Sequence, residues 1–149
     1  MSDHSPFRVV YTETDIDLLP KPNQARLIFT ETRPESALIS AVSVFAFSRA
    51  GVLMTRLRSR GWDLPAGHIE EGETPVQAVR RECFAETATH LADVTPLGFV
   101  ELTLYGPKPE GYRYPYPTSY IISYFAMVSA MADFKPIEEA IERSFMSPE

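Results

Sequence analysis

The sequence contains a single cysteine, Cys83, so it can form neither an internal disulfide nor a zinc site built from several cysteines. It also lacks a long apolar run. The most apolar stretch, residues 37–47, is interrupted by serines and is shorter than the roughly 20 residues that a membrane-spanning helix needs. No basic stretch followed by an apolar one opens the chain, which predicts a cytoplasmic protein without a leader peptide and without a membrane partner.

Basic residues are in the minority, with 14 Lys and Arg against 20 Asp and Glu, and the formal net charge is −6. Binding to a nucleic acid polymer or to an anionic membrane surface generally needs a net basic surface. The charge balance therefore argues against both as partners. An excess of acid suits a site that binds a cation.

The composition, with 44% hydrophobic and 23% charged residues, is typical of one globular domain, which we expect over residues 1–149. Residues 1–22 contain several prolines, and we expect this segment to form an extended or partly flexible N-terminal arm. Runs rich in β-branched and aromatic residues predict strands, two of which are joined by the turn-forming residues 48–51 into a hairpin. The strand candidates are residues 26–31, 38–48, 52–58, 97–105 and 119–128.

A helix is predicted from Thr74 to about Leu91. Thr74 is an N-cap candidate, Pro75 takes the first helical position, and Gln77 can complete a capping box. More helix is expected near residues 136–145. Strands before and after a well-capped helix predict an α/β fold, in which helices pack on a mixed β-sheet.

Glu82 and Glu86 are four residues apart on this helix and therefore share a face. Such a pair is an ordinary solvated helix face in many proteins. Here, however, the preceding residues 64–73 form a glycine-containing loop that leads into the helix N-terminus, where free N–H groups favour anions. Mg²⁺ is commonly held by one or two carboxylates together with substrate phosphates. The arrangement therefore predicts a site for magnesium and phosphate.

Five residues stand at the spacings of a known signature, G-x5-E-x7-R-E-U-x-E-E-x-G-U, in which U is aliphatic: Gly67, Glu73, Arg81, Glu82 and Glu86. The chain thus resembles the Nudix hydrolases, a MutT-like family, with a signature box from Gly67 to Thr89. The order of strands, loop and helix around the box extends the resemblance over most of the chain. It implies a Nudix-type α/β fold with a mixed sheet sandwiched between helices.

The box is degenerate at its end. Ala85 replaces the first glutamate of the Glu-Glu pair, Ala88 replaces the glycine, and Thr89 replaces the last aliphatic residue. Cys83 stands at the first aliphatic position, which is a mild change. The change at Ala85 removes one negative charge from the cation cluster and should weaken binding of a second or third metal.

The resemblance implies roles for individual residues. Glu82 and Glu86 would bind Mg²⁺, with Mn²⁺ as an alternative, joined by the backbone carbonyl of Ala66. Glu73 and Arg81 would form an internal salt bridge that holds the loop to the helix. The implied reaction is hydrolysis of a nucleoside diphosphate linked to another moiety by a metal-activated water. The candidates for the general base are Glu82, Glu86, Glu138, Glu139 and Glu142.

Substrate contacts are less specific. Arg56, Arg58 and Arg60 alternate along a predicted strand end, where they would contact phosphates or form a solvated edge. Trp62 is either a core anchor or a lid, and Tyr105 is a candidate for substrate binding. Features typical of ADP-sugar pyrophosphatases and of dinucleoside-polyphosphate hydrolases are both present, so the partner is a small nucleotide-type substrate of open identity. A homodimer is also left open.

Two other functions compete with the enzyme. The first alternative, which is based on Ala85, is a degenerate module that binds a nucleotide or sugar-nucleotide with little or no turnover. An acidic domain with a structural role and a coincidental motif is the second alternative. Residues 147–149 have the pattern of a helix start, so we expect either that the natural protein ends early or that a C-terminal helix is missing from this sequence.

Overall fold

The computed structural model describes residues 7–30 and 33–147. Two compact units are found in the chain: a first unit of Met1–Ser40 and Leu97–Ile122, and a second unit of Ala41–Pro96 and Ser123–Glu149. No helix within the described ranges is long and apolar enough to cross a bilayer. The expectation of one domain over residues 1–149 stays a prediction, and each unit is described by itself below.

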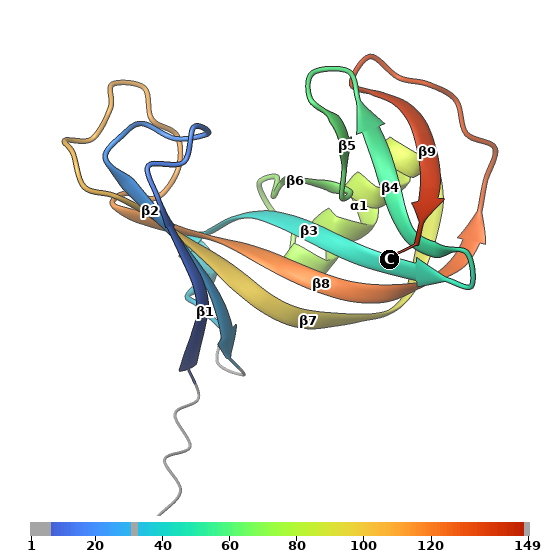
Figure 1. Ribbon diagram of the computed structural model, residues 1–149, viewed down its shortest axis with the longest axis horizontal. Coiled ribbons are helices and arrows are strands. Elements are labelled where there is room, and N and C mark those ends of the chain that lie inside the picture. The colour runs from blue at the N-terminus through green and yellow to red at the C-terminus, as the bar shows by residue number, and fades with distance from the viewer. Residues whose placement is uncertain (1–6, 31–32, 148–149) are drawn as a thin grey trace, which may run out of the picture. The chain divides into compact units, whose positions relative to one another are not determined.

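The described residues contain one α-helix, α1 (Pro75–Thr87), and one short 3-10 helix, η1 (Ser36–Leu38). They also contain nine strands, shown in Figure 1. The strands are β1 (Phe7–Thr14), β2 (Asn23–Thr30), β3 (Ile39–Ser48), β4 (Gly51–Leu57), β5 (Gly61–Asp63), β6 (Ala66–His68), β7 (Thr89–Leu104), β8 (Thr118–Met131) and β9 (Ala140–Met146).

The strands hydrogen-bond in the order β1-β2-β7-β8-β3-β4-β5, with β6 added to β3 and β9 to β4. β3 and β4 form the predicted hairpin, in which Phe47 pairs with Val52 and Ser48 with Gly51. Gly51 has a φ of +122°, and a Cβ there would lie 2.3 Å from the carbonyl oxygen of Met146. Glycine is therefore required at this turn both for its backbone conformation and for its small size.

The first unit is built on antiparallel pairing of β1 with β2, and of β2 with the end of β7. Ile28 and Phe99 lie directly opposite each other and are almost completely buried, so they form the centre of a small core. β1 lies within the segment expected to form an N-terminal arm, of which residues 1–6 are outside the described ranges.

In the second unit, α1 covers one face of the strands (Figure 1). Its residues Ala78, Val79 and Cys83 are completely buried. So are the strand residues that alternate toward the helix, such as Val44 and Leu53. Burying a side chain of the size of valine contributes about 1.5–3 kcal/mol, so packing rather than helix propensity fixes α1.

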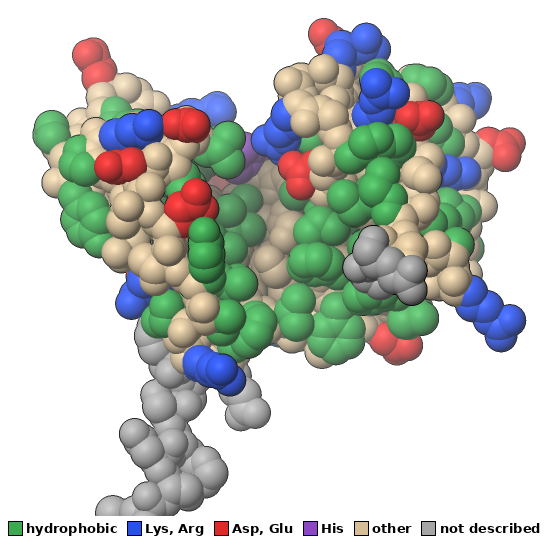
Figure 2. All heavy atoms as spheres, in the orientation of Figure 1, with side chains coloured by type: hydrophobic (Ala, Val, Ile, Leu, Met, Phe, Trp, Pro, Cys, Tyr) green, Lys and Arg blue, Asp and Glu red, His purple; other side chains and the backbone are tan. Residues whose placement is uncertain are grey.

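The opposite face of the same strands is also apolar. Phe47 pairs with Val52, and Val52 pairs with Met146, so all three side chains share this face. The Ser43–Ser123 hydroxyl contact of 3.0 Å indicates that the odd-numbered residues of β8 belong to it as well. These include Phe125, Met127 and Met131, all of which are exposed. Figure 2 shows apolar side chains gathered over the second unit in this view.

Two expectations about helices are wrong. The helix expected to reach Leu91 ends at Thr87, because Ala88 adopts a left-handed conformation and β7 begins at Thr89. The helix expected near residues 136–145 is largely the strand β9, which pairs with β4 from Val52 to Leu57. Pairing along a whole strand edge outweighs local helix propensity there. The possible helix start at residues 147–149 falls mostly outside the described residues.

Candidate active site

The N-terminus of α1 is fixed by the predicted capping box. The amide of Gln77 donates to the Thr74 hydroxyl at 3.2 Å, and the amide of Thr74 donates to the Gln77 side chain at 2.9 Å. Pro75 takes the first position, where an N–H would have no helical partner. The loop that precedes α1 therefore enters the helix at a defined angle.

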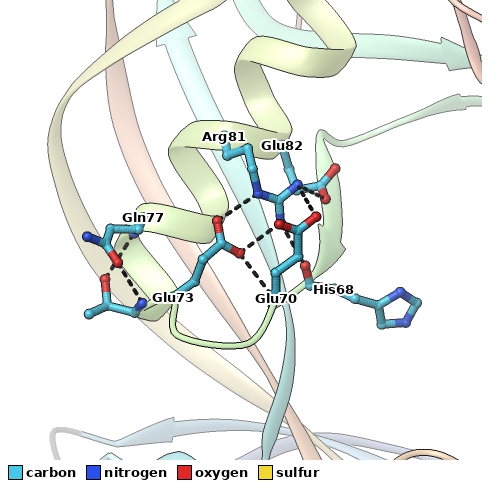
Figure 3. Close-up of polar contacts among 7 residues, drawn as sticks. His68, Glu70, Glu73, Gln77, Arg81 and Glu82 are labelled. Atoms are coloured by element: carbon cyan, nitrogen blue, oxygen red, sulfur yellow. Dashed lines mark hydrogen bonds and ion pairs between the residues drawn. The ribbon is translucent and has the colours of Figure 1, made fainter.

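Arg81 joins this loop to the helix (Figure 3). Its Nε donates to Glu73 Oε2 at 2.7 Å, and a terminal nitrogen donates to Glu73 Oε1 at 2.9 Å. The same nitrogen donates to the carbonyl of His68 at 3.0 Å. The salt bridge expected between Glu73 and Arg81 is thus present, in the bidentate geometry that makes such pairs strong.

This pairing perturbs both ionisable groups. The hydrogen bond from Arg81, aided by one from the amide of Glu70, lowers the pKa of Glu73 from 4.5 to about 2. The hydrogen bond to Glu73 in turn raises the pKa of Arg81. Both groups are therefore charged at every physiological pH.

The other terminal nitrogen of Arg81 contacts two further carboxylates (Figure 3). It donates to Glu82 Oε1 at 2.6 Å and lies 3.6 Å from Glu70 Oε1. One oxygen of Glu82 is therefore engaged by Arg81, while its side chain stays 20% exposed. The sequence pattern did not indicate Glu70, because no spacing rule connects this loop residue to the helix.

Glu86 is the most buried acid of the site, with 5% of its surface exposed. Its Oε1 accepts a hydrogen bond of 3.0 Å from the amide of Ala66. Burial raises the pKa of Glu86 to about 7, against the lowering effect of the Ala66 hydrogen bond. The charges of Glu82 and Glu139 raise the pKa further. The two helix carboxylates therefore face one another closely enough to interact, as the four-residue spacing predicts.

Gly67 leaves room for the Glu82 carboxylate directly beside the loop. A Cβ on Gly67 would lie 2.2 Å from the carboxylate carbon of Glu82, far inside van der Waals contact. β6 carries Gly67 and pairs with β3, with Val42 opposite Gly67 and Ser43 opposite Ala66. The sheet and the absent side chain together bring the loop backbone against the two carboxylates.

The donor set consists of two carboxylates, Glu82 and Glu86, beside the backbone of Ala66. Such oxygen donors suit a hard cation such as Mg²⁺, and one or two carboxylates are the number that Mg²⁺ commonly takes from a protein. Within residues 7–30 and 33–147 no cluster of three or more His, Cys, Asp or Glu side chains is arranged to hold a metal ion. Two carboxylates fit a cation that takes most of its ligands from water and substrate.

The departures from the signature have distinct consequences. Ala85 is exposed, so a carboxylate there would face solvent on the helix surface. Ala88 has a φ of +52°, a conformation that residues with a Cβ adopt at a cost, and Thr89 is completely buried. Cys83 is completely buried as well, and burial raises the pKa of its thiol to about 11. Cys83 is thus a packing residue.

The three arginines do not project together as a strand would place them. β4 ends at Leu57, so the alternation expected beyond this residue is wrong and residues 58–60 form a turn before Gly61. Each arginine has a different partner. Arg56 lies 3.4 Å from Glu142, Arg58 donates to the carbonyl of Glu138 at 2.9 Å, and Arg60 lies 3.2 Å from Asp63.

Trp62 lies on β5 opposite Arg56 and is 38% exposed, which is more than a core side chain shows. Tyr105 belongs to the first unit, where its hydroxyl donates to the Gln24 side chain at 3.0 Å. Tyr105 is 59% exposed, so its ring is open to a ligand. Substrate binding by Arg56, Arg58, Trp62 and Tyr105 stays a prediction.

Comparison with protein families identifies the chain. The family model for the NUDIX domain matches residues 37–149. The chain therefore belongs to the Nudix family, and the expected class, a Nudix hydrolase, is confirmed. Membership of this family supports phosphoanhydride hydrolysis as the general reaction.

Solved structures share the fold. The pyrophosphohydrolase BsRppH of Bacillus subtilis, solved as a point mutant, matches with a TM-score of 0.70 and 21% identity, over 91% of this chain and 76% of its own. A NUDIX hydrolase from Nitrosomonas europaea matches with a TM-score of 0.57 and 22% identity, over 73% and 72%. The E. coli dihydroneopterin triphosphate pyrophosphohydrolase matches with 0.52 and 18%, over 74% and 83%. These likenesses confirm the expected α/β fold of Nudix type.

Proposed function

We propose that this chain is a Mg²⁺-dependent hydrolase that cleaves the pyrophosphate bond of a nucleoside diphosphate linked to another moiety. The observation that carries the proposal is the Glu86 carboxylate, which is buried beside Glu82 and hydrogen-bonded to the amide of Ala66. A buried carboxylate without a cation is costly, because it has lost the water that stabilised its charge. A divalent cation would offset that cost.

Mg²⁺, or Mn²⁺ in its place, would be bound by Glu82, Glu86 and the carbonyl of Ala66, and would polarise phosphoryl oxygens and lower the pKa of the attacking water. Glu73 and Arg81 hold the loop against the helix, so that the amide of Ala66 stays within hydrogen-bond distance of the Glu86 carboxylate. In this proposal Glu73 and Arg81 act on the geometry of the site, while Glu82 and Glu86 contact the cation.

A general base must take the proton of the attacking water. Besides Glu82 and Glu86, the candidates are acids near the C-terminal end of the chain. Among these, Glu139 has the strongest support, because its charge acts on Glu86. Its backbone is also fixed, since the amide of Arg58 donates to the Glu139 carbonyl at 2.8 Å.

The leaving portion of the substrate would contact side chains around this cluster. The side chains of Arg56 and its partner Glu142 are both about half exposed, so a phosphate can compete for the Arg56 guanidinium. The Nε of Arg58 donates to the carbonyl of Glu138, and the two terminal nitrogens of the guanidinium can donate to an anion. Trp62 offers an exposed ring for stacking on a base. A substrate contact by Tyr105, which belongs to the first unit, stays a prediction of the sequence. Location in the cytoplasm and assembly as a homodimer stay predictions of the sequence.

The proposal is tested with a substrate panel: an ADP-sugar, a dinucleoside polyphosphate and a nucleoside triphosphate, each with Mg²⁺ and with EDTA. We expect Mg²⁺-dependent release of a monophosphate product by the wild type and its loss in Glu86→Gln. Glu71→Gln, an exposed acid of the same loop, is the matched control and should keep the wild-type rate. Equal turnover in Glu86→Gln and the wild type would refute the assignment.

The second candidate function is a module that binds a nucleotide or sugar-nucleotide without efficient turnover. The observation that favours it is Ala85, which leaves the cluster one carboxylate short of the signature. Comparing the wild type with Ala85→Glu separates the two functions. Turnover by both proteins supports the enzyme, whereas activity that is gained only by Ala85→Glu supports the binding module.

A further inference from the structure

The C-terminal end of α1 has no basic residue in its own last turn. The last carbonyls of a helix lack partners within the helix, and the helix dipole places partial negative charge there. A cation comes instead from β9, which packs against α1 (Figure 1). A terminal nitrogen of Arg143 donates to the carbonyl of Thr87 at 2.7 Å.

Arg143 is itself held in place from other sides. Its guanidinium carbon lies 5.5 Å from the centre of the Phe134 ring, within the range of a cation–π contact. In β9, Arg143 pairs with Thr55, which is completely buried, so the arginine leaves the strand on the face that α1 covers. A planar guanidinium restrained in this way is a rigid donor for the end of the helix.

The helix end needs such a donor. Ala88 follows the last helical residue in a left-handed conformation, which costs a residue with a Cβ roughly 1–2 kcal/mol. The amide of Ala132 donates to the Ala88 carbonyl at 2.8 Å, one residue beyond the contact of Arg143. Two bonds from the C-terminal third of the chain therefore keep the last turn of α1 in place.

Glu86 directly precedes Thr87, so the position of its carboxylate depends on the orientation of this last turn. Its 3.0 Å hydrogen bond to the amide of Ala66 requires that the turn does not rotate. We propose that Arg143 is a positioning residue for the cation site, which acts by binding the Thr87 carbonyl and thereby holding the Glu86 carboxylate against the loop. This inference rests on the proposed function, because it explains why the Glu86 carboxylate must be held where the proposed cation would bind.

The contact itself is tested by amide hydrogen exchange on the metal-free protein. In Arg143→Gln we expect faster exchange at Ala88, whose amide donates to the Phe84 carbonyl, with little change at Gln77 in the first turn. Arg80→Gln is the matched control, since Arg80 on the same helix also donates to a carbonyl, that of Leu91, at 2.6 Å. Unchanged exchange at Ala88 in Arg143→Gln would overturn the inference.

The positioning role is tested by Mn²⁺ binding, measured as loss of the free Mn²⁺ signal in electron paramagnetic resonance. We expect the Mn²⁺ dissociation constant of Arg143→Gln to rise about tenfold, as is typical when a residue that orients a ligand is lost. Arg143→Lys should recover most of the affinity, because lysine can still donate to the Thr87 carbonyl. Arg80→Gln should bind Mn²⁺ as the wild type does.

Unchanged affinity in Arg143→Gln, or an equal loss in Arg80→Gln, would show that Arg143 is structural only and would overturn the inference. A wild type that binds no Mn²⁺ gives a different result, because it would refute the proposed function and with it the purpose assigned to Arg143. Circular dichroism of each variant at the temperature of the titration verifies that the helix is intact.

Discussion

The main-chain amide of Ala66 donates to the buried carboxylate of Glu86 at 3.0 Å. This bond connects β6, in the loop region before α1, to the last turn of the helix, 20 residues further along the chain. One hydrogen bond does not compensate for the burial of the charge, because the pKa of Glu86 still rises to about 7. The site thus contains a carboxylate that is poorly stabilised until a cation binds.

Replacing Glu86 with glutamine should stabilise the metal-free fold at alkaline pH. The ordinary pKa of 4.5 applies to the unfolded chain and about 7 to the folded one, so the folded wild type binds more protons between these values and loses stability as the pH rises. Glutamine has no charge to bury and can still accept from Ala66. Between pH 5 and pH 8 the advantage of Glu86→Gln should grow by about 2 kcal/mol.

The measurement is urea unfolding of both proteins in EDTA at the two pH values. Glu71→Gln, which changes an exposed acid, should track the wild type at both. A stability difference between Glu86→Gln and the wild type that is independent of pH would contradict the raised pKa of Glu86.

Glu73→Gln should have the opposite pH dependence. The folded pKa of Glu73, about 2, lies below its ordinary value of 4.5, so its ion pair with Arg81 contributes stability above pH 4.5 that is lost as the pH falls toward 2. We therefore expect the variant to be less stable than the wild type at pH 7 and to approach it as the pH falls toward 2. Thermal unfolding followed by circular dichroism checks this, and a gap that widens toward low pH would count against the pairing.

Ala88→Gly should stabilise the protein by about 1 kcal/mol, since glycine adopts the left-handed conformation at φ +52° without the cost of a Cβ. Ala85→Gly is a control of opposite sign, because Ala85 lies within the helix and glycine there should destabilise by about 1 kcal/mol. Urea midpoints compare the two. If both variants are destabilised equally, the strain assigned to Ala88 is absent.

Gly67→Ala should lower turnover by about 10²-fold, because the new methyl group would occupy the space of the Glu82 carboxylate and displace it. Gly106→Ala is the matched control, since its Cβ would meet only the ring of Pro22 at 3.6 Å, an ordinary contact. Rates under saturating Mg²⁺ give the comparison. A fully active Gly67→Ala protein would mean that the position of Glu82 next to the loop is unimportant for catalysis.

Local signals account for the part of the site that the sequence predicts. The capping residues Thr74 and Gln77 and the pair Glu73 and Arg81 follow from fixed short spacings, and each is found in contact. The hairpin of β3 and β4 follows equally from strand residues on both sides of a turn. Interactions over short spacings leave a pattern that can be recognised in one sequence.

Long-range contacts leave no such pattern. Arg143 and Thr87 are separated by 56 residues, and nothing in the sequence connects them. β9 forms a strand because the backbone of β4 offers it hydrogen-bond partners along one edge. The residues of β9 by themselves would also be compatible with a helix. The end of α1 is not predictable from the sequence for the same reason, since the carbonyl of Ala88 accepts from the distant amide of Ala132 and no helix-stopping residue stands at this position.

The central claim is that Glu82 and Glu86 hold a divalent cation, and Mn²⁺ titration of the wild type and Glu86→Gln tests it most directly. Electron paramagnetic resonance reports free Mn²⁺ without any need to know the substrate. The account predicts saturable binding by the wild type and a loss of at least tenfold in affinity in Glu86→Gln. Equal binding by the two proteins, or none by the wild type, would contradict it.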